Sequence, residues 1–313
     1  MARQDHLFGI DTRVSDILDT DPGLLDVFSR LEVALGFGES TLDEVCTRHG
    51  LDALTVCLIC NVYSFDSYNP DPGTIARGHV TDVIRYLKNS HRHYRTSELV
   101  ELEDAVRRLI APFDPAHQKV IRRFFSEYKQ ELEKHFSYEE GEVFSYIQAL
   151  LFGRDTRGYS IGTFEANHGN VDEKLSDLKN LVMKTLPPEG DDEDRIALLR
   201  MLYRLQRDLA CHTAVEDRIL TPMVRYLEHP QAFRTQDMHA PSERNELTER
   251  EKEILVCVAR GMLNKEIADK YNISIYTVIS HRKNITRKTG IKTVAGLTVY
   301  ALLNGLIDTD IAG

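Results

Sequence analysis

Two His-x-x-x-Glu motifs, at residues 135–139 and 212–216, are the parts of this sequence best suited to bind a metal. On a helix, a residue and its fourth neighbour project from the same face, one turn apart. Each motif therefore offers an imidazole and a carboxylate to a common interior. Two such helices already supply four ligands.

Two further histidines continue the pattern. His91 precedes His135 by 44 residues, and His168 follows it by 33. This spacing predicts one set of metal-facing positions on each helix of a four-helix bundle. Four neutral imidazoles and two carboxylates suit a pair of iron ions, or alternatively manganese ions, with each Glu able to bridge both metals. A vacant position on each metal would bind a small ligand.

The carboxylates of Glu139 and Glu216 need compensation inside such a bundle. A lone histidine is more often a core or surface residue than a ligand, but a buried carboxylate is costly unless a metal or hydrogen bonds offset its charge. Metal coordination explains both burials. Glu140 and Glu142 are expected to face solvent. Three apolar residues are expected to share the core with the ligands: Phe136, Val143 and Ile147.

At these residues the chain resembles the hemerythrin-like di-iron domain, and most closely the iron-sulfur cluster repair (RIC, ScdA/YtfE-like) family, over roughly residues 8 to 227. In that family the ligands follow the order His, His-x-x-x-Glu, His, His-x-x-x-Glu. His93 is a second candidate for the first ligand, but the family's helix pattern favours His91. The resemblance implies six metal ligands here: His91, His135, Glu139, His168, His212 and Glu216.

Helical periodicity and turn residues predict an all-α protein. The bundle is expected within residues 79–227, and short breaks between its helices favour up-down topology. Its four helices are expected at residues 79–110, 116–151, 161–184 and 195–227.

Residues 1–70 are interpreted as a small N-terminal helical unit, similar to the amino-terminal domain of the repair family. Leu35 and Gly36 stand where that family usually carries a Cys-Cys pair, so cysteine-dependent chemistry is not carried over. A structural role, including a surface for a partner, fits this unit better. The Cys57-Leu-Ile-Cys60 stretch has apolar flanks, which favour a packed helix over a redox pair.

Composition predicts a soluble, cytoplasmic protein of two or three domains. The chain has 313 residues, 42% of them hydrophobic, and five cysteines, an odd number without the density of a secreted disulfide scaffold. No apolar run approaches the roughly 20 residues of a membrane span, and the start lacks the apolar core of a signal peptide.

Charge is divided unevenly along the chain. The net charge is −10, yet residues 244–313 hold 11 Lys and Arg against 8 Asp and Glu, a balance of +3 that leaves −13 on the first 243 residues. Only this tail, residues 244–313, therefore carries a net positive charge that would favour binding to the phosphates of a nucleic acid. Residues 228–245 lack apolar periodicity and are expected to form a linker to a domain at 246–313.

The tail is expected to form four helices with a helix-turn-helix. Thr248 and Glu251 form a capping box, Gly261 can end the first helix, and Asn264 and Ser274 can cap the next two. Between residues 274 and 292 there are five basic residues and no acidic one. Such a helix suits the major groove of DNA, with phosphates on both sides.

Residues 247–307 closely resemble the LuxR/FixJ-type helix-turn-helix domain. The shared features are Leu247-Thr-Glu-Arg-Glu, Asn264-Lys-Glu-Ile-Ala, Thr277-Val-Ile-Ser-His and the Gly305-Leu-Ile end. The resemblance places a dimerisation helix at residues 294–304 and implies a homodimer on double-stranded DNA. Base-facing positions are Ile279, Ser280 and Lys283; phosphate contacts are Lys265, Thr277 and Arg282, with Arg287 and Lys288 on the same basic helix.

A metal bundle joined to a DNA reader predicts a one-component regulator that senses oxygen, nitric oxide or redox state. Residues 1–243 lack the alternating strand and helix pattern of a phospho-acceptor domain. One alternative is an enzyme that repairs iron-sulfur clusters or handles nitric oxide or peroxide, with the tail serving to localise it. Another is an iron store or haem-associated protein, for which the sequence has no haem attachment motif.

Overall fold

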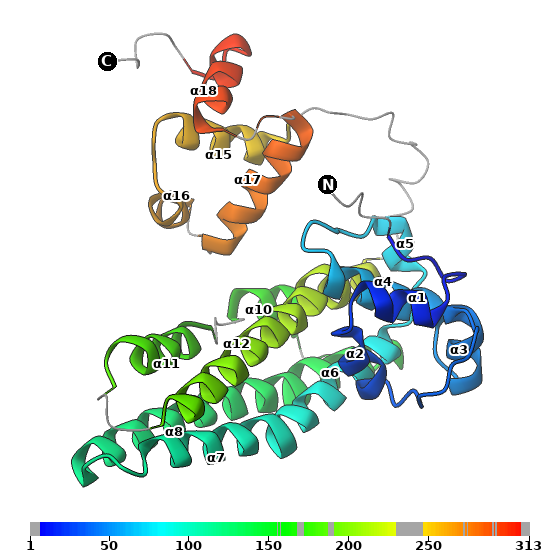
Figure 1. Ribbon diagram of the computed structural model, residues 1–313. Coiled ribbons are helices and arrows are strands. Elements are labelled where there is room, and N and C mark those ends of the chain that lie inside the picture. Colours follow the sequence, from blue (N-terminus) through cyan, green and yellow to red (C-terminus); the bar gives the residue numbers. More distant parts are fainter. Residues whose placement is uncertain are drawn as a thin grey trace. The chain divides into compact units, whose positions relative to one another are not determined.

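The structure is a computed structural model that describes residues 7–154, 156, 158–167, 172–186, 191–229, 247–271, 273, 275–289, 291 and 293–307. Every regular element in this part of the chain is a helix, as predicted, and its one extended feature is an isolated bridge between Arg13 and Thr41. The chain divides into two compact units, 1–234 and 235–313, which are described separately (Figure 1). Among the described helices, none is both long and apolar enough to cross a membrane.

Five short helices begin the first unit: α1 (Val14–Thr20), α2 (Leu24–Arg30), α3 (Leu42–His49), α4 (Ala53–Ser64) and α5 (Pro72–Ala76). α4 is buried along most of its length because apolar residues occupy nearly every side of it. Cys57 and Cys60 lie inside this helix as free, buried thiols, as expected. Burial raises the pKa of Cys57 to about 11, so its thiol stays protonated at neutral pH.

Three of the longer helical segments are continuous through a π-helical turn. These are α6 (Val80–His93), η1 (Tyr94–Glu98) and α7 (Leu99–Ile110); α8 (Pro115–Tyr138), η2 (Glu139–Val143) and α9 (Phe144–Leu151); and α12 (Asp192–Val215), η3 (Glu216–Leu220) and α13 (Thr221–Glu228). Their bounds lie within a few residues of the predicted helices. The helix predicted at 161–184 is represented by α10 (Ile161–Asn167) and α11 (Asp172–Lys184).

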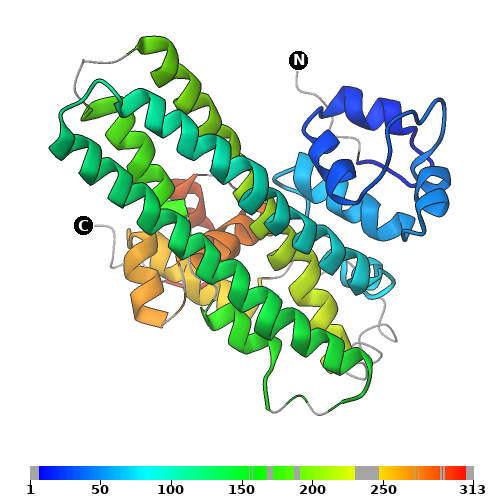
Figure 2. The same ribbon diagram turned by 90° about the horizontal axis from the view of Figure 1, so that it is seen from below.

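The long helices pack along one another. α7 lies against α8 and α12, and α11 lies against the same two helices (Figure 1, Figure 2). Their apolar faces form one core cluster. A second cluster joins residues of α1–α4 to residues of α6, η2, α9 and η3. The helices predicted as a separate N-terminal unit therefore share a core with one end of the bundle.

A buried ion pair fixes this junction. Arg30, at the end of α2, donates from Nη1 to Asp208 Oδ1 of α12 over 2.9 Å, and its Nη2 also hydrogen-bonds Asp208 Oδ2. The side chains are 4% and 8% exposed. Asn89 donates to the Arg30 carbonyl over 2.5 Å, which ties α6 to the same point. Planar, two-point pairing of this kind constrains orientation as well as distance.

The second unit contains α15 (Glu249–Ala259), α16 (Asn264–Tyr271), α17 (Ile275–Thr289) and α18 (Val294–Leu303). The predicted capping box is confirmed: Glu251 N donates to Thr248 Oγ1 over 3.2 Å, and Thr248 N donates to Glu251 Oε2 over 2.8 Å. Gly261, with φ of +78°, follows α15 as expected. Asn264 does not cap α16; it is the first helical residue, and its Oδ1 accepts from Arg282. Ser274 and most of the predicted linker lie outside the described residues.

Asp208→Asn should destabilise the first unit by about 3–5 kcal/mol, because it leaves the buried Arg30 guanidinium without its counter-charge. Urea unfolding followed by far-ultraviolet circular dichroism measures this, since the chain has no tryptophan. Arg207→Gln is the matched control: Arg207 is 63% exposed and lies 3.3 Å from Asp21, so its loss should cost less than about 1 kcal/mol. Equal losses for the two variants would contradict the structural role of the buried pair.

Candidate metal centre and DNA-binding surface

Four of the predicted ligands converge in the interior of the first unit: His91, Glu139, His212 and Glu216. One donor atom from each lies within 4.8 Å of the other three. Their residues are at most 1% exposed. These residues come from α6, η2, α12 and η3, and the first and last of them are 125 residues apart in the sequence.

π-helical turns lie at or close to three of the predicted ligand positions. Glu139 is the first residue of η2, Glu216 is the first residue of η3, and η1 begins three residues after His91. A π turn holds one more residue per hydrogen-bonded loop than an α turn, so it shifts the register of the helix that follows, and such turns often occur at functional sites. The His-x-x-x-Glu motifs locate two of these turns, but the sequence analysis did not predict them.

The carboxylate of Glu139 lies between two histidines. Its Oε2 is 3.1 Å from His91 Nε2, and its Oε1 is 2.9 Å from His135 Nε2. Because each oxygen addresses a different imidazole, this carboxylate is placed to bridge two positions. On the other side, His212 Nε2 is 3.1 Å from His91 Nε2 and 3.3 Å from Glu216 Oε1.

Five of the six predicted ligands are therefore gathered in one place. His135 is 14% exposed at the side chain and lies at the edge of the group. His168 lies outside the described residues, between α10 and α11, so its role as a ligand stays a prediction. His93, the second candidate for the first ligand, is not in the converging group; its Nε2 lies 3.5 Å from Glu98 Oε1.

The chemistry of these donors fits a metal cation. Two carboxylates and two imidazoles in a fully buried position carry a charge that the protein interior stabilises poorly. Burial acts to lower the pKa of His91, but hydrogen bonds to Glu139 and Glu140 outweigh it and raise that pKa. A divalent ion would supply the positive charge without a proton, and mixed imidazole and carboxylate ligands suit iron, manganese or zinc.

Glu140 and Arg95 support His91 from outside the group. His91 Nδ1 lies 2.9 Å from Glu140 Oε1, which also accepts from Arg95 Nη1 over 2.7 Å. Hydrogen bonds from His91 and then Arg95 lower the pKa of Glu140 to about 2, so it is ionised at neutral pH. A proton held on Nδ1 leaves the Nε2 lone pair directed at the metal position.

The expectation that Glu140 faces solvent was wrong. Its side chain is 33% exposed and turned toward α6. The periodicity of apolar residues predicts which side of a helix is buried. It does not predict which residues beside that buried face contact a neighbouring helix. Glu142 is exposed, as expected. Phe136, Val143 and Ile147 are buried, and the Phe136 ring stacks on the His91 imidazole at 4.3 Å.

The predicted DNA contacts all lie on α16 and α17, and two of them have partners inside the domain. Lys265 and Thr277 are exposed and Ile279 is half-buried. Arg282 Nη1 donates to Asn264 Oδ1 over 2.6 Å, and Lys288 Nζ donates to Glu251 Oε2 over 2.6 Å. These bonds hold α17 against α16 and α15. The side chains of three further predicted contacts lie outside the described part: Ser280, Lys283 and Arg287.

Comparison with known families gives two matches. Residues 82–224 match the hemerythrin HHE cation binding domain, and residues 245–301 match the luxR family of bacterial regulatory proteins. The first match covers the converging histidines and glutamates and indicates a metal-binding site. The second covers α15–α17 and most of α18, and it indicates binding to DNA.

Relatives with similar sequence are regulatory proteins. The chain is 48% identical over 61 residues to the transcriptional regulatory protein MctR of Rhizobium johnstonii. The matched residues are 20% of this chain and 28% of MctR. It is also 31% identical over 130 residues to the oxygen regulatory protein NreC of Staphylococcus carnosus. The matched residues are 42% of this chain and 54% of NreC. NreC of Staphylococcus aureus gives the same identity and coverage. The chain thus spans about half the length of these relatives or less.

Glu140→Gln should weaken metal binding by about 10- to 100-fold, because the neutral amide holds the His91 proton less strongly. Metal affinity is measured by competition with a chelator of known affinity. Glu142→Gln changes the same chemical group two residues away on the exposed side and should leave the affinity unchanged. Equal affinities for the two variants would show that Glu140 does not support the site.

Lys265→Ala should weaken binding to a mixed-sequence DNA duplex and lower the slope of log affinity against log salt by about 1, as expected for one lost phosphate contact. Fluorescence anisotropy at several salt concentrations gives both quantities. Lys270→Ala is the control, since its ammonium contacts Cys257 Sγ of α15 at 3.5 Å. If the slope is the same for Lys265→Ala and the unmodified protein, Lys265 does not contact phosphate.

Proposed function

We propose that this chain, in which a hemerythrin HHE cation binding domain precedes a LuxR-type DNA-binding domain, is a one-component transcriptional regulator. Its signal is oxygen, nitric oxide or redox state, sensed at a di-iron centre. The observation that carries the proposal is the buried group His91, Glu139, His212 and Glu216 in the same chain as a domain that binds DNA.

Two metal positions account for the arrangement of donors. His91, His212 and Glu216 would hold one ion, while His135 and the predicted ligand His168 would hold the second. Glu139 would bridge them, which is supported by its two oxygens facing different imidazoles. A bound iron pair supplies reversible one-electron chemistry and an exchangeable position for a diatomic ligand.

The surrounding residues hold the donors and keep water away. Glu140 and Arg95 fix the orientation of His91. Aromatic rings enclose the same imidazole: Phe136 stacks on it, and Phe144 lies 6.0 Å from it on a nearly parallel plane. Tyr94 meets the ring of His212 edge-on at 5.8 Å. A small ligand at the metal site would be surrounded by apolar side chains. In this low-dielectric environment, a change in the charge of the metal would change the energies of nearby groups strongly.

A continuous helical segment runs from the site to the C-terminal end of the helices described in the first unit. Glu216 begins η3, which runs directly into α13 and ends at Glu228, the last helical residue before the predicted linker. The carboxylate of Glu228 accepts from Ile161 N over 2.8 Å and hydrogen-bonds Tyr146. A change in metal ligation at Glu216 would therefore reach Glu228 and its contacts with α9 and α10, just before the linker in the sequence, and this is the coupling we propose.

The relatives favour oxygen as the first signal to test, because NreC is named an oxygen regulatory protein. Dimer formation through α18 is also proposed. Val299 and Leu303 are 54% and 81% exposed on this helix, one turn apart, and a second copy would cover them.

The affinity of the anaerobically purified protein for a promoter fragment should change by at least about fivefold on exposure to oxygen or nitric oxide. Electrophoretic mobility shift under anaerobic conditions measures the change, and the visible spectrum of the same sample reports the metal. Glu139→Gln should abolish the response, whereas Glu142→Gln should retain it, because only Glu139 contacts two histidines.

Three results would contradict this proposal: one equivalent of zinc in place of iron, a DNA affinity that is the same in all gas conditions, or a full response from Glu139→Gln. Circular dichroism of each variant separates loss of the signal from loss of the fold. Turnover of nitric oxide or peroxide without a change in DNA affinity would favour the enzyme alternative.

A further inference from the structure

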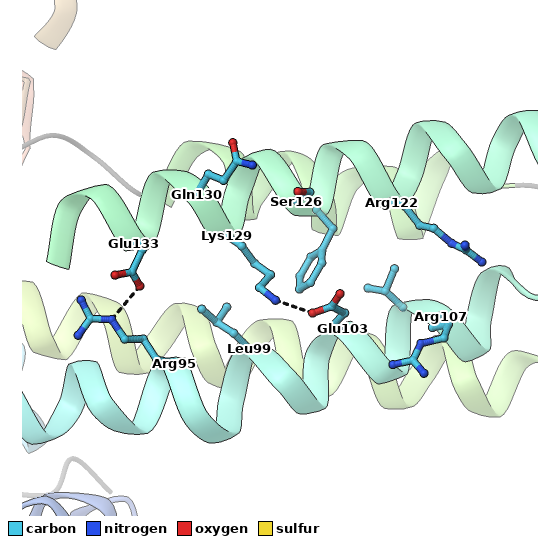
Figure 3. A pocket seen from close by; sticks show the side chains of 11 residues that line it. Arg95, Leu99, Glu103, Arg107, Arg122, Ser126, Lys129, Gln130 and Glu133 are labelled. Carbon is cyan, nitrogen blue, oxygen red and sulfur yellow. Dashed lines mark hydrogen bonds and ion pairs between the residues drawn. The ribbon is translucent and has the colours of Figure 1, made fainter. Parts of the chain in front are cut away.

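A groove of about 640 Å³ lies between α7 and α8, and it contains none of the predicted metal ligands (Figure 3). Its volume is in the range of small-molecule sites, which are typically concave, apolar at the base and polar at a few points. The base here is apolar: Leu99, Val106 and Phe125 line the groove and are each at most 5% exposed. Most of each side chain is packed against the protein, and the remainder faces the groove, where it can contact an apolar part of a ligand.

The polar lining is richer in cations than in anions. Arg95, Arg107, Arg122 and Lys129 line the groove together with only two carboxylates, Glu103 and Glu133. This balance differs from that of the chain, whose net charge is −10. A cationic groove on an otherwise acidic protein favours an anionic occupant.

Two of these cations already form ion pairs with carboxylates of the protein. Arg95 Nε donates to Glu133 over 2.8 Å while its Nη1 donates to Glu140. Lys129 donates to Glu103 across the groove over 2.5 Å (Figure 3). Their charges are balanced within the protein, so they are poor candidates for holding a ligand.

The remaining two cations lie at the same end of the groove, the end away from Arg95 (Figure 3). Arg107 of α7 and Arg122 of α8 project there from facing helices (Figure 3). Arg122 donates to the neutral Gln118 Oε1 over 2.9 Å and forms no ion pair with a described carboxylate. Arg107 pairs with Asp104 three residues earlier, in a contact whose side chains are 66% and 47% exposed. Exposed pairs of this kind contribute little and yield readily to a competing anion.

We propose that this groove binds a small amphipathic carboxylate. Its carboxylate would lie between Arg107 and Arg122, because guanidinium groups match a carboxylate with two parallel hydrogen bonds. Its apolar chain would lie along the parts of Val106, Phe125 and Leu99 that face the groove. A phosphate-rich ligand fits less well, since it would bring multiple negative charges toward Glu103 and Glu133 and leave the apolar base uncovered.

Octanoate is a suitable probe, and isothermal titration calorimetry on the full-length purified protein measures its binding. We expect saturable binding of one octanoate per chain, weakened at least about tenfold in the double variant Arg107→Gln, Arg122→Gln, which loses both charge-assisted contacts. Arg123→Gln is the matched control. Arg123 is the next residue on α8, its side chain is 80% exposed, it pairs with Glu127 and it does not line the groove.

Octan-1-ol tests the charge separately, because it has the apolar chain without the carboxylate, and it should bind at least about tenfold more weakly than octanoate. Four outcomes would overturn the proposal: no saturable octanoate binding, equal binding by the double variant and the control, equal binding of octanol, or capture of the protein by phosphatidylglycerol vesicles through these arginines in place of free octanoate. None of these measurements depends on a gas response or on DNA, so the proposed function and this site can fail independently.

Discussion

The first unit depends on the burial of two carboxylates, Glu139 and Glu216, beside the imidazoles of His91 and His212. A charged carboxylate in an apolar interior either takes up a proton or destabilises the fold. A cation bound between Glu139 and Glu216 would remove this cost. The neighbouring features all help to bring the donors to this point and keep them there: the π turns that begin at each glutamate, the Glu140–Arg95 support and the aromatic wall.

This constraint reaches beyond the long helices. Asp208 lies one turn before His212 on α12 and binds Arg30 of α2 in a buried pair. The guanidinium of Arg30 lies 5.2 Å from the centroid of the Tyr94 ring, which in turn meets His212. The N-terminal helices therefore pack within two contacts of the predicted ligand His212 and share a hydrophobic core with the helices around it.

The sequence predicts the helical class and the convergence of His91, Glu139, His212 and Glu216, because a four-residue spacing determines which side chains share a helical face. It does not predict the π turns, whose extra residue leaves no distinct local pattern. It also gives no sign of the Arg30–Asp208 pair, since contacts between residues 178 apart depend on how complete helices pack. The error at Glu140 has the same origin: its partner His91 lies on another helix. The cap predicted at Asn264 was wrong because Asn264 is the first residue of α16, not the residue before it.

The central claim is that donors from separate helices bind a pair of metal ions, and anomalous diffraction tests it most directly. Crystals of protein reconstituted anaerobically with iron would be measured on both sides of the iron absorption edge. The account predicts two anomalous peaks, one beside His91, His212 and Glu216 and the other beside His135, with Glu139 between them. A single peak elsewhere, or no peak among these side chains in fully reconstituted crystals, would contradict it.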